Sequence, residues 1–127
     1  MGRGERVLFV DDEPQITNIT RRTLERLGYR VLAFGSATDA LKTFRADPSA
    51  FDVVISDLTM PGLTGAQLAV EMRRLRANLP VILSTGYLDR LDAETARDLH
   101  VRELLIKPYT TEALANAVRR ALKDAAA

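Results

Sequence analysis

The chain has 127 residues, of which 46% are hydrophobic and 28% are charged, a composition typical of one globular domain rather than a disordered chain. Eighteen basic side chains against seventeen acidic ones leave a formal charge of +1, so no global charge favours nucleic acid or an anionic membrane. The absence of cysteine excludes disulfides, thiolate metal sites and a cysteine nucleophile, and a single histidine excludes a histidine-pair metal site.

No stretch approaches the roughly 18 apolar residues needed to span a bilayer, and the first residues lack the apolar core of a signal peptide. We therefore expect no membrane contact by this segment and a cytoplasmic location, with which the lack of cysteine agrees. With no linker or low-complexity stretch inside it, the chain is expected to form one domain over residues 1–127.

Five short apolar runs recur, at residues 7–10, 31–34, 53–55, 81–83 and 104–106. Each is apolar throughout rather than alternating, as in parallel strands that are covered on both faces, and the stretches between them are long enough for crossover helices. This alternation predicts an α/β fold, a single doubly wound five-stranded parallel sheet with right-handed crossovers.

The stretches between the runs carry apolar residues at helical spacing. The expected inward-facing stripes are Ile16, Ile19, Thr23, Leu24 and Leu27; Ala40, Leu41 and Phe44; Leu68, Ala69, Met72 and Leu75; Leu91 and Leu99; and Leu114, Ala117, Val118, Ala121 and Leu122. Pro14 suits a first helical turn, residues 36–39 resemble a capping box, and Gly28 suits a C-terminal cap. Three arginines are expected on a solvated helix face: Arg73, Arg74 and Arg76.

Polar residues stand where the strands end, and in open α/β sheets ligands bind outside those carboxyl ends. They are Asp11, Asp12 and Glu13 after the first run, Asp57 after the third, Thr85 after the fourth and Lys107 after the fifth. Carboxylates at one edge repel each other unless a cation or shared protons intervene, and Mg²⁺ is the usual cation beside a phosphate. An aspartate can also attack phosphorus, giving an acyl phosphate whose oxygens a metal ion, a lysine and a hydroxyl can compensate.

Each of these residues alone has an ordinary structural explanation. Asp11 and Asp12 can be favourable charges at a helix N-terminus, and Asp57 can be a turn residue. Thr85 can be a cap and Lys107 a solvated lysine. Their joint placement at one edge favours a chemical role over these explanations.

Four motifs follow one another along the chain: Val10-Asp11-Asp12-Glu13, DLTMPGLTG at residues 57–65, Thr85-Gly86 and Lys107-Pro108. In this order and spacing they resemble the receiver domain of two-component response regulators, over essentially the whole chain. The resemblance implies a flavodoxin-like (βα)5 fold with strand order 2-1-3-4-5. It also implies a switch in phosphorelay signalling that catalyses its own phosphorylation and dephosphorylation, partnered by a histidine kinase or a histidine phosphotransfer domain.

The resemblance implies a role for each acidic residue. Asp57 would accept the phosphoryl group from a phosphohistidine. Asp12 and Asp57 would bind Mg²⁺ directly, together with the backbone carbonyl of Thr59, and Asp11 would act mainly through water.

The remaining site residues would act on the phosphoryl group itself. The Thr85 hydroxyl would move toward it, and Lys107 would pair with it, aimed by a cis peptide bond before Pro108. Thr59 and Tyr87 would border the group and tune its hydrolysis.

Three positions depart from the commonest family pattern: Leu104 replaces an aromatic residue, His100 a glycine and Tyr109 a phenylalanine. Because Leu104 lacks a ring and a hydroxyl, we expect signalling through Thr85 rather than through an aromatic switch. The expected readout face consists of the helix at residues 88–99 with the fifth strand and fifth helix, and it is also the candidate homodimer surface.

Other functions remain open. A Mg²⁺-dependent phosphohydrolase with Asp57 as nucleophile would need a substrate cap, for which the short connections leave little sequence. A flavin-binding electron carrier is disfavoured because the carboxylates after the first strand would repel a phosphate. Residues 80–87, together with residues 4–8 at the start, look similar to receivers of hybrid sensor histidine kinases; the alternatives are a free-standing response regulator or the receiver of a transcription factor. No direct nucleic-acid binding by this segment is expected.

Overall fold

The computed structural model describes residues 2–58, 60, 62–86 and 103–126. Its strands are β1 (Arg6–Val10), β2 (Arg30–Phe34), β3 (Val53–Asp57), β4 (Val81–Thr85) and β5 (Glu103–Ile106). Its α-helices are α1 (Pro14–Arg26), α2 (Ala37–Ala46), α3 (Gly65–Leu75) and α5 (Thr111–Ala126), with a short 3-10 helix, η1 (Pro48–Ala50). The helix expected at residues 88–99 lies outside the described residues.

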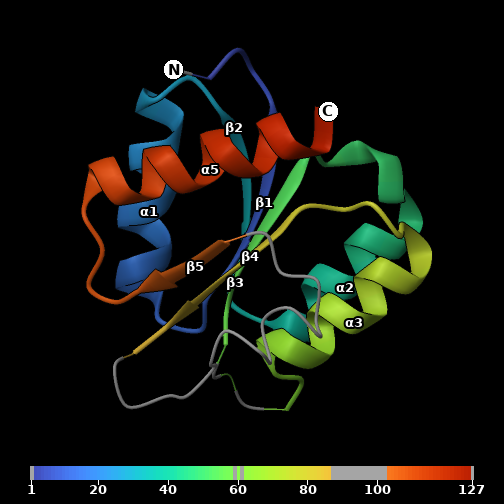
Figure 1. Ribbon diagram of the computed structural model, residues 1–127. Helices are drawn as coiled ribbons and strands as arrows, with labels where there is room; N and C mark the ends of the chain where they lie inside the picture. The colour runs from blue at the N-terminus through green and yellow to red at the C-terminus, as the bar shows by residue number, and fades with distance from the viewer. Residues whose placement is uncertain (1, 59, 61, 87–102, 127) are drawn as a thin grey trace.

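The five strands form one parallel sheet in the order β2-β1-β3-β4-β5, which confirms the predicted fold class and strand order. Helices α1 and α5 cover one face, and α2 and α3 cover the other (Figure 1). Among the described residues, we find no helix with the length and hydropathy of a membrane span.

The core is divided by the sheet into two clusters, because alternate residues of each strand point to opposite faces. In β1, Leu8 and Val10 face α2 and α3, whereas Val7 and Phe9 face α1 and α5. The central strand β3 is buried along its whole length, which explains its unbroken apolar run. The stripe expected on α5 is confirmed, with Leu114, Ala117, Val118 and Ala121 all buried.

Four residues expected inside the core are instead exposed. Ile19 on α1 is 66% exposed, because the inward face of this helix carries Thr20, Thr23 and Leu24. Leu75 lies in the last turn of α3 and is 44% exposed. Leu32 and Ile106 are 46% and 52% exposed because β2 and β5 are the edge strands, which the helices cover only in part.

The arginines at the end of α3 do not all lie on a solvated face, although the sequence predicts that they do. Arg73 donates a hydrogen bond to the carbonyl of Leu79, and Arg76 donates to the carbonyls of Phe51 and, at 3.3 Å, Pro48. These two side chains therefore satisfy backbone carbonyls of the neighbouring loops instead of lying on a solvated face. Arg74 is solvent-exposed as expected and pairs with Glu71 at 3.0 Å.

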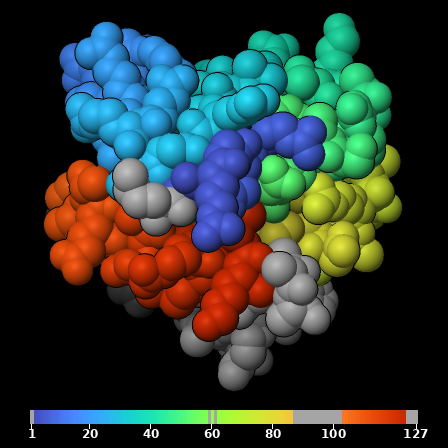
Figure 2. Space-filling model, turned by 90° about the horizontal axis from the view of Figure 1, so that it is seen from above, coloured from blue at the N-terminus to red at the C-terminus, as the bar shows by residue number. Residues whose placement is uncertain are grey.

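Figure 2 shows the end of the molecule opposite the carboxyl edge of the sheet, where the N-terminal residues, in dark blue, lie against α5, in red. The backbone amide of Gly2 donates to the carbonyl of Leu27 at 2.6 Å, and that of Gly4 donates to the carbonyl of Gly28 at 2.8 Å. Gly28 adopts φ +98° just after α1, the left-handed conformation expected at a helix C-terminus.

Candidate functional site

The candidate site lies at the carboxyl edge of the sheet, where parallel strands bring their ends together. Asp57 is the last residue of β3, and Thr85 is the last residue of β4. Asp11 follows β1, which pairs with β3, and Lys107 follows β5, which pairs with β4. Residues that are far apart in the sequence thus meet because their strands are neighbours.

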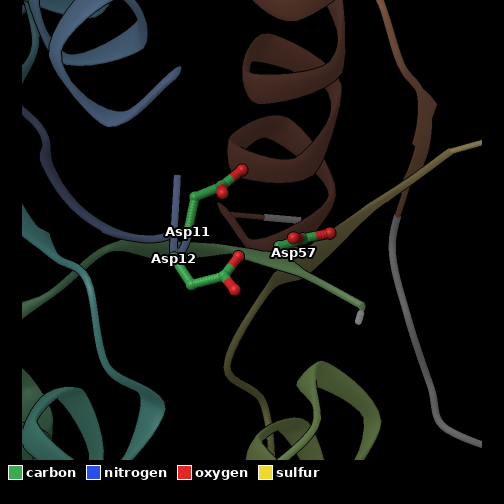
Figure 3. A group of neighbouring side chains, drawn as sticks. All are labelled: Asp11, Asp12 and Asp57. Atoms are coloured by element: carbon green, nitrogen blue, oxygen red, sulfur yellow. The ribbon is translucent and has the colours of Figure 1, made fainter. Parts of the chain in front are cut away.

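Three carboxylates gather there: Asp11, Asp12 and Asp57 each place an oxygen within 4.8 Å of the others (Figure 3). Asp11 is fully buried and Asp57 is 5% exposed, whereas Asp12 is exposed. Two buried carboxylates so close together require compensation by positive charge. The cluster is therefore compatible with a bound cation.

The ammonium group of Lys107 supplies part of that charge. Its Nζ lies 2.8 Å from Asp11, 3.3 Å from Asp57 and 3.9 Å from Glu13. Burial lowers the pKa of Lys107, but the hydrogen bonds and charges of Asp11 and Asp57 outweigh burial and raise the pKa above its ordinary value. Lys107 is therefore cationic at neutral pH.

The backbone around Lys107 aims its side chain into the site. The Lys107 amide donates to the carbonyl of Thr85 at 2.8 Å, and the peptide bond from Lys107 to Pro108 is cis, as the resemblance implies. The ring of Tyr109 packs against the cluster under α1 and α5, and its hydroxyl lies 3.3 Å from that of Thr20. The loop that carries Lys107 is thus attached to both β4 and α1.

Of the other predicted site residues, Thr85 is described by the structure, whereas Thr59 and Tyr87 are not. Thr85 is buried beside β3, and its hydroxyl donates to the carbonyl of Gly86 at 3.1 Å. Thr59 and Tyr87 lie outside the described residues, as does His100. The structure therefore brings together the three aspartates and the lysine of the predicted set, with Thr85 at the end of the adjoining strand.

The start of α3 contributes a feature that the sequence reasoning missed. Thr64 and Gln67 form a reciprocal capping box, for which the T-x-x-Q spacing was an available signal. Gly65, which follows Thr64 and begins α3, brings the helix backbone very near to β3. A Cβ atom at this position would lie 2.2 Å from the carbonyl oxygen of Asp57. Only glycine permits this approach, which sets the position of α3 beside the phosphoacceptor candidate.

The chemistry of the cluster fits a hard divalent cation. All three aspartates offer oxygen atoms, which are the ligands that Mg²⁺ prefers, and exposed Asp12 leaves room for the waters that this ion retains.

A sequence model of the response regulator receiver domain matches residues 7–119. The chain belongs to this family. The C4-dicarboxylate transport transcriptional regulatory protein DctD of Rhizobium meliloti is 35% identical over 95% of this chain. The transcriptional regulatory protein GlrR of Escherichia coli is 32% identical over 94% of it. The chain spans 26% and 27% of these relatives, about a quarter of their length.

Solved structures agree with this assignment. A response regulator receiver domain protein from Clostridium thermocellum matches with a TM-score of 0.89 and 32% identity, covering 94% of this chain and 95% of that one. The response regulator TrrA of Thermotoga maritima, solved in complex with Mg²⁺-BeF, matches with a TM-score of 0.83 and 30% identity, covering 93% and 99% of the two chains. The receiver domain fold predicted from the motifs is thereby confirmed.

Proposed function

We propose that this receiver domain takes a phosphoryl group from a phosphohistidine onto Asp57 in a Mg²⁺-dependent reaction. The observation that supports this most is the position of Asp57, at the end of the buried central strand, within the carboxylate cluster and 3.3 Å from Lys107. The donor would be a histidine kinase or a histidine phosphotransfer domain, and residues 1–127 would act as one domain.

In the proposed transfer, a carboxylate oxygen of Asp57 attacks phosphorus while the bond from phosphorus to the donor's imidazole nitrogen breaks. The electron pair of that bond stays on the ring nitrogen, and because the other ring nitrogen carries a proton, the donor leaves as neutral imidazole. Lys107 supplies positive charge to a phosphoryl oxygen, and the Thr85 hydroxyl turns from the carbonyl of Gly86 to donate to another. Thr59 and Tyr87 are proposed to tune hydrolysis of the product.

Asp12 and Asp57 are proposed to hold Mg²⁺ directly with the Thr59 carbonyl, while Asp11 acts through water. The ion, when bound, would neutralise the carboxylates and the phosphoryl oxygens. The carboxylate cluster supports this ligand set, and so does the likeness to TrrA, whose structure contains Mg²⁺-BeF. Asp11 is better placed to hold Lys107, at 2.8 Å.

The phosphoacceptor is tested with the Asp57→Asn variant. The wild type is incubated with Mg²⁺ and acetyl phosphate or a phosphorylated kinase, and the base-labile, hydroxylamine-sensitive label is mapped. The variant should carry no label, because its amide oxygen is a poor nucleophile. A matched control, Asp39→Asn on the exposed start of α2, should label normally. An undiminished label in Asp57→Asn would refute the assignment.

The metal site is tested with Asp12→Ala. Mg²⁺ binding to the wild type should be weak, because the ion keeps several waters, and removing Asp12 should abolish it. The fold should survive, with a slightly higher melting temperature in the absence of metal, because an exposed carboxylate that repels its neighbours has been removed. Undiminished Mg²⁺ affinity in a titration of this variant would place the ion elsewhere.

We propose that this receiver serves in a hybrid sensor histidine kinase, with a free-standing response regulator or the receiver of a transcription factor as the alternatives. The similarity of residues 80–87 to hybrid kinase receivers supports a hybrid sensor histidine kinase, whereas DctD and GlrR are transcriptional regulatory proteins and support the receiver of a transcription factor equally well. Phosphorylation is proposed to be read out at the face of β5, α5 and residues 88–99, where a homodimer would also form. The exposure of Ile106 on β5 is consistent with such a contact.

A further inference from the structure

The third acidic residue after β1, Glu13, has no role in the proposed function, yet it belongs to the same charge cluster. Its carboxylate lies 3.9 Å from Nζ of Lys107, which lies 3.3 Å from Asp57. The Glu13 side chain is 63% exposed, against 16% for Lys107 and 7% for Asp57. Glu13 therefore stands at the solvent-facing rim of the site and is linked to Asp57 through a single ammonium group.

The backbone of Glu13 is fixed, whereas its carboxylate is not needed to start the helix. Its amide donates to the Asp11 carboxylate at 2.9 Å, and its carbonyl accepts from the amide of Thr17 at 3.0 Å. Glu13 occupies the N-cap position of α1, but its side chain makes no capping hydrogen bond. A capping hydrogen bond thus does not account for the acidic side chain, and its remaining contribution to α1 is a favourable charge at the helix N-terminus.

The charge balance shows what Glu13 adds. Among the described residues, Lys107 places its ammonium group near Asp11, Glu13 and Asp57, and Asp12 joins Asp11 and Asp57 in the carboxylate cluster. These four carboxylates outweigh that one ammonium group together with a divalent cation, so the described part of the site keeps a net negative charge. A phosphoryl donor is itself an anion and must approach Asp57 against this field. Glu13 contributes to the repulsion, and draws on the charge of Lys107, without being the phosphoacceptor or a proposed metal ligand.

We propose that Glu13 is a specificity-determining residue that disfavours small, free anionic phosphodonors at Asp57. A donor group held on a docked protein gains binding energy from contacts elsewhere, whereas a small donor depends on the local field alone. The repulsion therefore acts mainly against the small donor. This inference rests on the proposed function of Asp57.

The test compares Glu13→Gln with the wild type in phosphorylation by acetyl phosphate, at a Mg²⁺ concentration that saturates each protein. Glu13 and Asp57 lie 3.9 and 3.3 Å from the same Nζ, so a donor at Asp57 is about 7 Å from the Glu13 charge. At that separation, Coulomb's law in water with a Debye length of about 10 Å gives a rate about threefold higher in the variant for a dianionic donor. The gain should be smaller with phosphoramidate, which carries less negative charge. It should disappear near 1 M salt, where the Debye length falls to about 3 Å.

The matched control is Glu25→Gln, which makes the same charge change near the other end of α1, where Glu25 pairs with Arg21 at 3.0 Å. Its rate should equal that of the wild type. An electrostatic effect of Glu13 depends on the salt concentration and on the charge of the donor, whereas a structural effect of the substitution depends on neither. A rate in Glu13→Gln that is unchanged or lower, or a gain that persists at high salt, would overturn the inference while wild-type labelling of Asp57 stays normal. Failure of the wild type to label at Asp57 would instead overturn the proposed function, and the inference with it.

Discussion

At the scale of single residues, Lys107 and the proposed Mg²⁺ ion would compete for the same carboxylates. Nζ lies 2.8 Å from Asp11 and 3.3 Å from Asp57, and Asp57 is also a proposed metal ligand. Without metal, the ammonium group partly neutralises two buried acids; with metal, two cationic centres repel each other. Lys107 thus stabilises the metal-free site and would oppose metal binding.

Replacing Lys107 by Met should separate these two effects. We expect the Mg²⁺ affinity of Lys107→Met to rise about fivefold, because a repelling charge is lost. The metal-free variant should lose about 1–3 kcal/mol of unfolding free energy, because a buried carboxylate is left uncompensated. Both are measured by Mg²⁺ titration and urea denaturation, with Lys42→Met, at an exposed position of α2, as a control that changes neither. A lower Mg²⁺ affinity would contradict the competition.

At the scale of secondary-structure elements, local patterns predicted the strands well. An unbroken apolar run such as that of β3 predicts a strand buried on both faces, and the residue that ends it, Asp57, then falls at the functional edge. The candidate site follows from this logic, because the carboxyl ends of parallel strands must meet. Contacts of Lys107 with Asp11 and Asp57, both distant in the sequence, were therefore predictable in kind, although the preference of Lys107 for Asp11 was not.

Features that depend on non-local packing were not predictable from the sequence. Leu32 and Ile106 belong to apolar runs like the others, and only the strand order places them at the edges of the sheet. Arg76 has the pattern of a surface residue, but its guanidinium satisfies carbonyls of the loop before β3. The role of Gly65 depends on how closely α3 approaches β3, which no local signal encodes.

Gly65 provides a sharp test of this approach. In Gly65→Ala the new Cβ would lie 2.2 Å from the carbonyl oxygen of Asp57, so α3 or the end of β3 must move. We expect a loss of about 3 kcal/mol in unfolding free energy, measured by urea denaturation. The control Gly62→Ala, at φ +77° with no atom within 4 Å of the added Cβ, should lose only about 1–2 kcal/mol through backbone strain. Equal losses would contradict a steric role for Gly65.

At the scale of the whole molecule, groups at both ends of the sheet bind their protons more tightly in the folded state. Near the site, burial raises the pKa of the Tyr109 hydroxyl, although its hydrogen bond with Thr20 lowers it, and the carboxylates outweigh burial to raise the pKa of Lys107. At the opposite end, burial and the charge of Glu5 raise the pKa of Tyr29. The candidate site and the N-terminal end should therefore both lose stability as their protons are released at alkaline pH.

These shifts predict a loss of stability at alkaline pH. Below the ordinary values of 10.0 for tyrosine and 10.5 for lysine, both the folded and the unfolded chain hold these protons, so the full contribution is present. As the pH rises further, the unfolded chain releases its protons first, and each group costs up to about 1.4 kcal/mol per pH unit until its folded-state pKa is passed. In urea denaturation, these groups should leave the unfolding free energy flat between about pH 7 and 9 and lower it above about pH 10. Tyr29→Phe and Tyr109→Phe should each make the alkaline decline shallower, because each removes one titrating group. A decline in both variants as steep as that of the wild type would show that these tyrosines do not cause the loss of stability.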